Sequence, residues 1–270
     1  MTVEFIRGNA RAEGTADMAK RQALVTGATG GIGKAISARL RADGLSVRTM
    51  DVAGEPDVTM DLTIDSIPEW AVEDVDVCVS VAGIVDTFAP AHSMSAEKWS
   101  RDIDANLTGA FRVIQACLRG MRERRFGRII AISSIAGQMG SPGKVAYAAA
   151  KAGLHGMIRT IAIENTGHGI TANCVLPGMI ATPKVMALPP ADQERILDAI
   201  PSGRFGSPDE VADLVAFLAR DEAGYITAQE IGIDGGLQLN SLFVGPDRRS
   251  ADRSRVSDSG TARAALNAAD

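Results

Sequence analysis

Short runs of apolar residues alternate with longer stretches of mixed polarity between residues 21 and 239. The apolar runs lie at 22–26, 45–50, 57–60, 75–81, 128–132, 171–176 and 230–233. Their continuous apolar character predicts strands that are covered on both faces. The stretches at 31–43, 96–124 and 145–165 are long enough for helices, and the first carries Ile32, Ile36 and Leu40 on one stripe.

A further helix is expected directly after Ser207. Ser207 and Glu210 have the spacing of a capping box, and Pro208 occupies the first helical position. Strands that alternate with helices form a parallel sheet with right-handed crossovers. The pattern therefore predicts a single doubly wound α/β domain, with a parallel sheet of about seven strands and helices on both faces.

The two ends of the chain are poorer in large apolar side chains than the middle. Residues 1–20 are mostly small or polar, and residues 241–270 alternate Arg, Asp, Ser and Ala. Such segments bury too little surface to offset the entropy lost on ordering them. We therefore expect a flexible N-terminal extension at 1–20, one folded domain at 21–240 and a disordered polar tail at 241–270.

Composition and charge exclude several kinds of partner. The chain has 28 Lys and Arg against 33 Asp and Glu, a net charge of −5, whereas nucleic-acid binding needs a basic face. No apolar run approaches the ~18 residues of a membrane span, and residues 1–20 lack the apolar core of a secretory signal. The three cysteines and three histidines are isolated, so neither disulfides nor a metal site are expected. These features predict a reduced, cytoplasmic protein that binds no nucleic acid, membrane or metal.

A glycine-rich turn joins the first predicted strand to the first predicted helix. It contains Gly27, Gly31 and Gly33 in the pattern Thr-Gly-x-x-x-Gly-x-Gly, with Thr29 and Ile32 between them. Glycines there let the backbone approach a pyrophosphate, and the free N–H groups of the helix N-terminus point toward it. The Lys-Ser/Thr ending of an ATP-type P-loop is absent from this turn. The turn therefore predicts a dinucleotide site.

Asp51, at the end of the second predicted strand, favours NAD over NADP. It lies about 20 residues beyond the turn, where a carboxylate accepts hydrogen bonds from the adenosine ribose hydroxyls and repels a 2′-phosphate. Arg48 lies on the same sheet face as Met50, away from the ribose edge, and position 30 is Gly rather than a basic residue. The alternative is that Asp51 is only a turn aspartate.

Tyr147 and Lys151 are four residues apart on a predicted helix, so both side chains leave the same face. A free phenol ionises far above neutral pH, and a neighbouring ammonium stabilises its phenolate. Small residues surround the pair, among them Ala146, Ala148 and Gly153, and leave room for a large ligand. The pair is therefore a candidate general acid/base.

The ordered motifs from residue 21 to about residue 239 closely resemble the short-chain dehydrogenase/reductase family, in particular its 3-oxoacyl reductases. Besides the glycine turn and the Tyr147–Lys151 pair, Ser134 precedes the tyrosine by 13 residues, and Asn106 lies in an Ala-Asn-Leu-Thr-Gly segment. Pro177-Gly178 with Thr182 and Asp234-Gly235-Gly236 match segments after the family's last two strands.

The resemblance implies a Rossmann-like NAD-binding catalytic domain at 21–240 and metal-free hydride transfer between NAD(H) and a ketone or secondary alcohol. By resemblance, Tyr147 is the acid/base and Ser134 hydrogen-bonds the substrate oxygen. Lys151 binds the nicotinamide ribose and lowers the tyrosine pKa, and Asn106 holds a water that links the lysine to solvent. The implied cofactor-binding residues are Gly27, Thr29, Gly31, Ile32, Gly33, Asp51, Asp61, Leu62, Ala82, Gly83, Tyr147, Lys151, Pro177, Gly178, Ile180 and Thr182.

Two features depart from the family pattern. Ser80 and Val81 stand where the family has two asparagines, so the backbone of Ala82 and Gly83 must supply the contact near the cofactor ribose. The segment between the second and third predicted strands is too short for the family's usual helix, and Gly54 in it predicts a loop. The adenine end of the site is then more open.

The segments expected to face the substrate lie at 84–91, 135–145 and 179–200. They are rich in apolar residues, with Gln138 as the main neutral polar group and Lys144 and Lys184 as cations expected to be exposed. This composition favours an apolar or mixed ketone or secondary alcohol over a small acid.

A 3-oxoacyl thioester of coenzyme A or acyl carrier protein is the alternative substrate. Arg122, Arg124 and Arg125, together with Arg128, could meet an acidic carrier, but such a run also suits a solvated helix end. Asp51 speaks against NADP-dependent biosynthetic reduction.

The remaining expectations concern the oligomeric state of the protein and whether it is an enzyme. By resemblance the chain is a homo-oligomer, dimeric or tetrameric, with helices 96–124 and 145–165 at its interfaces, although their apolar residues could equally be core. A non-catalytic NAD-binding regulator on the same fold is the other class of function. Because Asn106, Ser134, Tyr147 and Lys151 are all present, we expect an enzyme, an NAD-dependent oxidoreductase that acts on CH–OH groups.

Overall fold

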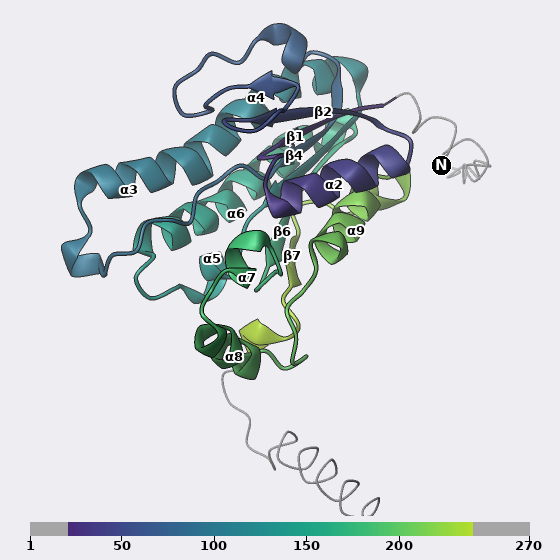
Figure 1. Ribbon diagram of the computed structural model, residues 1–270. Coiled ribbons are helices and arrows are strands. Elements are labelled where there is room, and N and C mark those ends of the chain that lie inside the picture. The colour runs from purple at the N-terminus through teal and green to yellow at the C-terminus, as the bar shows by residue number, and fades with distance from the viewer. Residues whose placement is uncertain (1–20, 240–270) are drawn as a thin grey trace, which may run out of the picture. The chain divides into compact units, whose positions relative to one another are not determined.

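A parallel sheet of seven strands runs through residues 21–239, the part of the chain that the computed structural model describes (Figure 1). Its order is β3-β2-β1-β4-β5-β6-β7. The strands are β1 Gln22–Thr26, β2 Ser46–Asp51, β3 Val58–Thr59, β4 Val75–Ser80, β5 Gly127–Ile132, β6 Ile170–Pro177 and β7 Glu230–Ile233. The predicted fold class, doubly wound with about seven parallel strands, is confirmed.

Helices connect the strands. The α-helices are α2 Gly31–Ala42, α3 Ala96–Ile103, α4 Gly109–Arg124, α5 Ala136–Met139, α6 Val145–Asn165, α7 Pro183–Met186, α8 Pro190–Ala199 and α9 Pro208–Leu218. The 3-10 turns are η1 Glu69–Ala71, η2 Ala91–Ser93, η4 Thr166–His168, η5 Asp221–Ala223 and η6 Leu237–Leu239. The capping box predicted at Ser207 is present, with hydrogen bonds in both directions between Ser207 and Glu210.

The predicted helix 96–124 is interrupted where the site lies. A π-helical turn, η3 Asp104–Thr108, separates α3 from α4 and contains Asn106. Such wide turns are rare and are found mostly at functional sites. Between β2 and β3 the chain forms a loop, as predicted, and β3 has only two residues.

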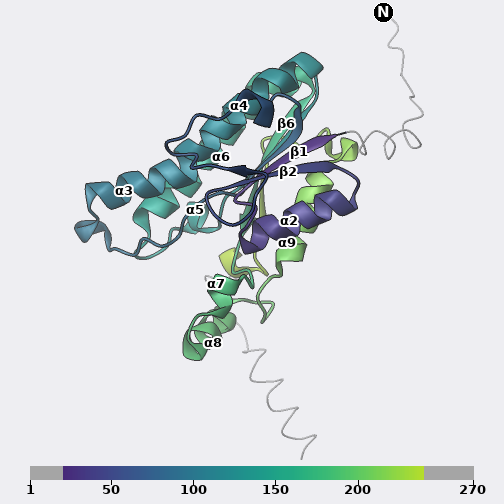
Figure 2. The same cartoon turned by 45° about the horizontal axis from the view of Figure 1, so that its top comes forward.

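Helices cover both faces of the sheet, with α4 and α6 on one side and α2 and α9 on the other (Figure 2). Alternate strand residues point to opposite faces, so each face has its own hydrophobic core. The core under α4 and α6 includes Leu24, Cys78, Ile129, Ile114 and Leu154. The core under α2 and α9 includes Val25, Val79, Ile130, Ile36 and Val215. The three cysteines are free and buried, as predicted.

The described residues up to Gln238 belong to one compact unit. The extension expected at 1–20 and the tail expected at 241–270 lie outside the described residues. Within residues 21–239, no helix is long and apolar enough to cross a membrane.

Candidate active site

The sheet has its switch point at β1, which pairs with β2 on one side and with β4 on the other. Because the crossovers leave these strands in opposite directions, a crevice opens at their carboxyl ends. A cavity of about 1000 Å³ lies there. The predicted cofactor residues that line it are Gly27, Thr29, Gly31, Ile32, Gly33, Asp51, Asp61, Leu62, Ala82, Gly83 and Thr182.

The glycine turn lies directly against the end of β4. Gly27 has a φ of +61°, and a Cβ there would come 2.7 Å from the backbone nitrogen of Ala82, so any side chain would both strain the backbone and collide. Helix α2 follows Gly30 without a side-chain cap. The N–H groups of its first turn are therefore available to an anionic ligand.

Asp51 ties the glycine turn to the end of β2. Its Oδ2 accepts hydrogen bonds from the Thr29 backbone nitrogen at 2.9 Å and from the Thr29 hydroxyl at 2.7 Å. The other oxygen accepts a bond from the Val52 backbone nitrogen at 2.7 Å. A carboxylate has about four acceptor positions, so Asp51 still has capacity toward hydroxyl groups in the cavity.

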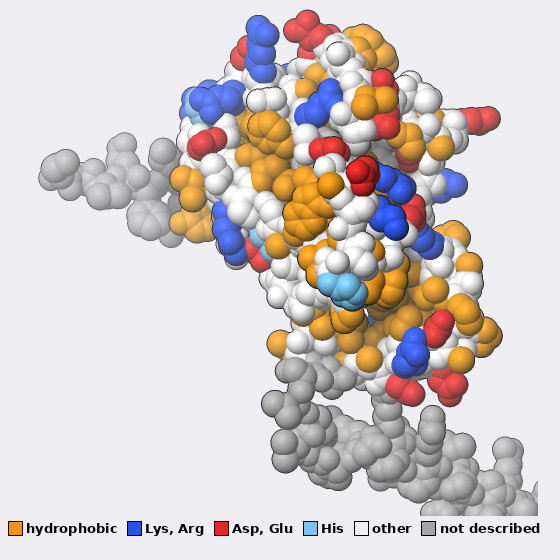
Figure 3. Space-filling model, turned by 90° about the vertical axis from the view of Figure 1, so that its left-hand side faces the viewer, with side chains coloured by type: hydrophobic (Ala, Val, Ile, Leu, Met, Phe, Trp, Pro, Cys, Tyr) orange, Lys and Arg blue, Asp and Glu red, His pale blue; other side chains and the backbone are white. Residues whose placement is uncertain are grey.

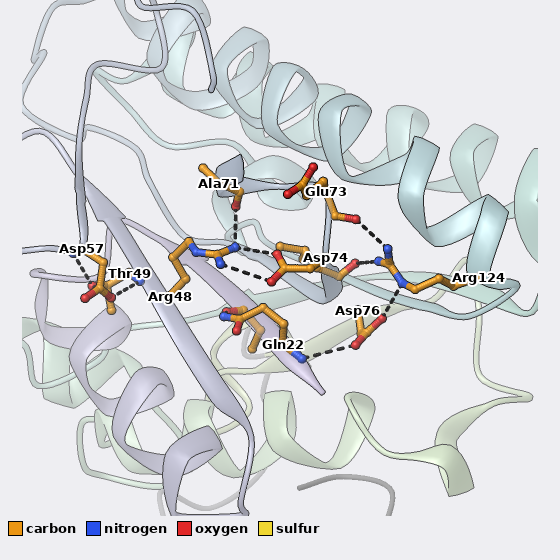
Figure 4. A network of polar contacts seen from close by, with 11 residues as sticks. Gln22, Arg48, Thr49, Asp57, Ala71, Glu73, Asp74, Asp76 and Arg124 are labelled. Atoms are coloured by element: carbon orange, nitrogen blue, oxygen red, sulfur yellow. Dashed lines mark hydrogen bonds and ion pairs between the residues drawn. The ribbon is translucent and has the colours of Figure 1, made fainter. Parts of the chain in front are cut away.

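Arg48, the nearest arginine along β2, is held away from the cavity. Figure 4 shows its guanidinium directed to Asp74 and the carbonyl oxygen of Ala71, with nitrogen–oxygen distances of 2.7 Å and 3.1 Å. Arg48 does not line the cavity, and its place relative to a bound ribose stays a prediction. Within this network the guanidinium of Arg48 is already paired, and it offers no charge to a 2′-phosphate.

Asp61 and Leu62 line the cavity beyond β3. The Asp61 carboxylate accepts bonds from the Thr63 hydroxyl at 2.7 Å and the Thr63 nitrogen at 2.8 Å. These bonds hold the pKa of Asp61 below its usual range. Asp61 is therefore ionised at neutral pH.

Thr26 supports the chain at the end of β4, where Ser80 and Val81 stand at the positions of the family's two asparagines. Its hydroxyl accepts hydrogen bonds from the backbone nitrogens of Val81 and Ala82, both at 3.1 Å. These bonds fix the chain after β4 beside the glycine turn. The role of Thr26 was not expected from the sequence, although it is the first residue of the glycine motif.

Lys151 lies behind Gly83, on α6. Its side chain is buried, and its ammonium donates a 2.8 Å hydrogen bond to the carbonyl oxygen of Ile132, the last residue of β5. Burial lowers the pKa of Lys151 to about 8. A Cβ on Gly83 would lie 3.5 Å from the Lys151 nitrogen, so glycine leaves the lysine close to the cavity wall.

Asn106 faces the same point from the π-helical turn. Its amide nitrogen donates to the carbonyl oxygens of Asp102 at 2.9 Å and Ile84 at 3.0 Å. Its Oδ1 is buried without a hydrogen-bond partner among the described residues. That oxygen lies 2.4 Å from where a Cβ on Gly83 would stand. The structure thus brings Asn106 and Lys151 together on either side of Gly83.

Tyr147 precedes Lys151 by one helical turn, and the lysine nitrogen lies 5.7 Å from the centre of the tyrosine ring. Burial raises the pKa of Tyr147, and a hydrogen bond with the Ser134 hydroxyl partly opposes this rise. The expectation that Lys151 lowers the tyrosine pKa is wrong for this state of the protein. The ammonium is directed to the Ile132 carbonyl, and desolvation of the phenolate outweighs any attraction to it.

The loop after β6 closes the other side of the cavity. A Cβ on Gly31 would come 3.1 Å from the Thr182 side chain, so this loop lies on the glycine turn. Pro177, Gly178 and Ile180 lie outside the cavity wall, and the Ile180 side chain is buried in the core under α9. Any contact of these three residues with a cofactor would have to come through their backbone.

The cations near the substrate segments differ from expectation in one case. Lys184 is exposed, as predicted, lines the cavity and forms an ion pair with Asp86. Lys144, also expected to be exposed, is half-buried, and its burial lowers its pKa.

The arginine run at the end of α4 matches the interpretation of a solvated helix end, and its guanidinium groups also bind neighbouring elements. Arg122 donates to Asn165, Arg124 to Asp76 and two carbonyl oxygens, and Arg125 to the carbonyl oxygen of Gly167. Arg128 is buried and donates to three carbonyl oxygens. These arginines join α4 and β5 to neighbouring elements, as Figure 4 shows for Arg124. Arg122, Arg124 and Arg125 are exposed at the last turn of α4 and just beyond it, as the interpretation of a solvated helix end expects, whereas Arg128 is buried.

The residues around the cavity fit a nicotinamide dinucleotide. The uncapped N-terminus of α2 suits the pyrophosphate, Asp51 suits a ribose diol, and the unpartnered Asn106 oxygen adjoins the buried Lys151. The volume of about 1000 Å³ also suits a ligand of this size.

Comparison with known proteins gives the same class. A family model described as enoyl-(acyl carrier protein) reductase matches residues 27–238. An acetoacetyl-CoA reductase of Shinella zoogloeoides is 41% identical over 237 residues, which cover 80% of this chain and 98% of that protein. The 3-oxoacyl-[acyl-carrier-protein] reductase MabA of Mycobacterium bovis is 44% identical over 233 residues, 81% of this chain and 93% of that protein.

A third relative and a solved structure agree with these. The 3-oxoacyl-[acyl-carrier-protein] reductase FabG of Thermotoga maritima is 40% identical over 239 residues, covering 80% of this chain and 97% of that protein. The crystal structure of gox2181 superposes with a TM-score of 0.74 at 32% identity, covering 83% of this chain and 99% of that one.

The fold and the cavity define a Rossmann-like nicotinamide-dependent oxidoreductase. More particularly, the chain belongs to the short-chain dehydrogenase/reductase family, whose members act on CH–OH and keto groups.

Proposed function

We propose that the protein is an NAD(H)-dependent reductase of 3-oxoacyl thioesters, working between the ketone and the secondary alcohol. The observation that carries the cofactor choice is Asp51 at the ribose edge of the cavity, with Arg48 bound to Asp74. The thioester is inferred from the names of three relatives that are at least 40% identical to this chain. Two of these relatives are named for acyl-carrier-protein thioesters and one for a coenzyme A thioester.

The segments that would face the acyl group support an apolar chain. Phe88, Met139 and Met186, one from each predicted substrate segment, are exposed large hydrophobic side chains. The first two segments are joined, because the Ala89 nitrogen donates a 2.8 Å bond to the carbonyl oxygen of Gly143. Apolar walls of this kind bind an acyl chain better than a small acid.

A nicotinamide held in the cavity would supply the hydride that reduces the ketone carbon. The Tyr147 hydroxyl donates its proton to the ketone oxygen, and the Ser134 hydroxyl hydrogen-bonds the same oxygen. The raised pKa of Tyr147 keeps the phenol protonated, which is the form that reduction needs. The Lys151 ammonium holds the nicotinamide ribose and stabilises the phenolate that forms.

Asn106 serves the return of the proton. We assign its unpartnered Oδ1 to a water molecule that connects Lys151 to solvent. Its amide nitrogen is already fixed by Asp102 and Ile84, so the oxygen has one defined direction. Pro177, Gly178, Ile180 and Thr182 complete the proposed cofactor set, with the first three acting through their backbone.

The direct test measures the oxidation of NADH, by its absorbance, with a panel of carbonyl substrates. We expect acetoacetyl-CoA to be reduced with NADH, and simple aliphatic ketones to be reduced less well. If the protein reduces a simple ketone but none of the thioesters, the proposed substrate class is wrong, whereas the proposed carbonyl reduction is supported. Absence of turnover with every carbonyl compound would favour a non-catalytic NAD-binding protein.

Replacing Asp51 by asparagine is expected to narrow the ratio of NADPH to NADH dissociation constants by about tenfold. Removing one ribose-facing charge relieves its repulsion of a 2′-phosphate and weakens the bonds to the diol. Titration of each cofactor by fluorescence measures the ratio. Glu55→Gln is the matched control, because it removes the same charge from an exposed position in the adjoining loop. An unchanged ratio in Asp51→Asn would contradict the NAD assignment.

Assembly and location are also proposed. Trp99 on α3, Phe111 on α4 and Ile163 on α6 are exposed, and Figure 3, which turns the α3 side toward the viewer, shows hydrophobic side chains gathered there. Such surfaces suit contacts with a second copy of the chain. We propose a dimer or tetramer through these helices, testable by light scattering. The cytoplasmic location stays a prediction.

A further inference from the structure

Behind the catalytic pair lies a cluster of polar side chains that the proposed chemistry does not use. His155, one helical turn beyond Lys151 on α6, is buried, and its Nε2 lies 2.8 Å from the Ser133 hydroxyl. Its Nδ1 lies 3.1 Å from the carboxylate of Glu230, the first residue of β7. Only about 12% of the Glu230 side chain is exposed. Ser133, His155 and Glu230 thus form a continuous chain of contacts, hereafter the relay.

The relay reaches two parts of the site. At one end, the Ser133 hydroxyl lies 3.0 Å from the carbonyl oxygen of Lys151. At the other, Glu230 accepts a 2.7 Å bond from Gln138 on α5 and forms an ion pair with Arg159. Gln138, expected to be a polar group for the substrate, is therefore directed to Glu230.

Helix α5 also packs on the imidazole. A Cβ on Gly137 would lie 3.0 Å from the His155 ring. The same helix begins next to Ser134, whose hydroxyl accepts a 3.1 Å bond from the Ala136 nitrogen. Any shift of His155 or Glu230 would thus be transmitted to the segment that carries Ser134.

The hydroxyl of Ser133 has one proton and two acceptors within reach. When His155 is neutral, its Nδ1–H donates to Glu230 and its Nε2 accepts a hydrogen bond from the Ser133 hydroxyl. When His155 is protonated, both ring nitrogens donate, and the Ser133 hydroxyl must turn and donate to the Lys151 carbonyl. Both arrangements use contacts of 3.1 Å or less. Protonation therefore reverses the direction of the relay.

We propose that His155 and Glu230 are positioning residues for the reductase reaction, and that they hold Ser133, Lys151 and α5 in the arrangement that turnover needs while His155 is neutral. The proposal rests on the proposed roles of Ser134 and Lys151. Ser133 itself is not a nucleophile here, because it is buried and lies outside the cavity wall.

The charged groups around His155 set the direction of the pH effect. Burial lowers the pKa of His155, Glu230 opposes this, and Arg159 and Lys151 on its own helix add to it. From β6, Cys174 is a neutral thiol, because burial raises its pKa to about 12. From β5 and α5 the facing groups, Ser133 and Gln138, are uncharged. His155 is therefore neutral at neutral pH, and the relay reverses only as the pH falls through its lowered pKa.

The first experiment follows kcat and KM for acetoacetyl-CoA reduction across pH in three proteins. Wild type should lose kcat on the acid side, with KM changing less. His155→Gln, which has an amide near the Nε2 position but does not titrate, should retain activity near neutral pH within about threefold and lose the acid limb. Glu230→Gln removes the charge that favours the imidazolium, so its acid limb should move to lower pH. His168→Gln, away from the site, is the control.

The second experiment follows the protonation of His155 and the amide exchange of α5 in the absence of turnover. The chain has three histidines, so proton NMR can follow the His155 ring alone. Its titration midpoint should fall in Glu230→Gln. Amide exchange in α5 of the wild type should quicken as His155 becomes protonated.

The outcomes separate this proposal from the proposed function. If wild type does not reduce acetoacetyl-CoA, the substrate assignment fails while the NMR titration and α5 exchange still test the relay. The relay is overturned if the titration midpoint of His155 is the same in wild type and in Glu230→Gln. It is also overturned if His155→Gln keeps the acid limb of wild type. Should either variant fail to fold, pH-dependent α5 exchange in wild type decides, and its absence counts against the relay.

Discussion

Tyr147→Phe is expected to lower kcat for carbonyl reduction by about 10³-fold, because the proton for the ketone oxygen then has no donor at that position. Cofactor affinity should change little, since the change removes one hydroxyl, which in the proposed reaction binds the ketone oxygen. Steady-state rates with acetoacetyl-CoA and NADH measure the first quantity, and fluorescence titration of NADH measures the second.

The chain contains a matched control for this change. It has two tyrosines, and the other, Tyr225, is fully exposed. Tyr225→Phe should therefore leave both kcat and cofactor affinity unchanged. Turnover by Tyr147→Phe at the wild-type rate would remove Tyr147 from the proton transfer.

Lys151→Met is expected to lower kcat/KM by about 100-fold and at the same time to raise thermal stability near neutral pH. The rate falls because the charge that holds the ribose and stabilises the phenolate is lost. Stability rises because burial lowers the pKa of Lys151 from 10.5 to about 8. At about 1.4 kcal/mol per pKa unit, the buried ammonium destabilises the folded state by about 3 kcal/mol below pH 8.

The sign of the pH dependence follows from the lowered pKa. The folded protein gives up the Lys151 proton at about pH 8, whereas the unfolded chain keeps it to the ordinary value of 10.5. Wild type therefore gains stability relative to Lys151→Met as pH rises through this window. Melting temperatures of both proteins from pH 7 to about 10 should converge. Lys98→Met, an exposed lysine on α3, should show no such convergence, and a constant gap for Lys151→Met would contradict the account.

The hydrophobic pattern predicted the architecture because buried parallel strands and amphipathic helices have different periods. The glycine turn, Asp51 and the Tyr147–Lys151 pair were also predictable, since each motif lies within one strand, turn or helix. The structure collects most of the predicted cofactor residues around one cavity. Their roles in binding and catalysis stay predictions until the variants are measured.

The features that the sequence could not predict depend on contacts between distant segments. Thr26 supports Val81 and Ala82 across 55 and 56 residues. Glu230 reaches His155 from the last strand, and neither residue carries a local pattern. The predicted direction of the Tyr147 pKa shift was wrong for a related reason. Spacing on a helix places two side chains on one face, but it does not show how much water each loses or which carbonyl the ammonium binds.

Transfer of label from deuterated NADH to acetoacetyl-CoA tests the central claim most directly, because it follows the hydride itself. With wild type we predict one deuterium in the hydroxyacyl product, and with Tyr147→Phe no product above background over the same time. Product that carries label only when deuterated NADPH replaces NADH would contradict the role of Asp51. A wild-type protein that binds NADH and transfers no label to any ketone would contradict the account as a whole.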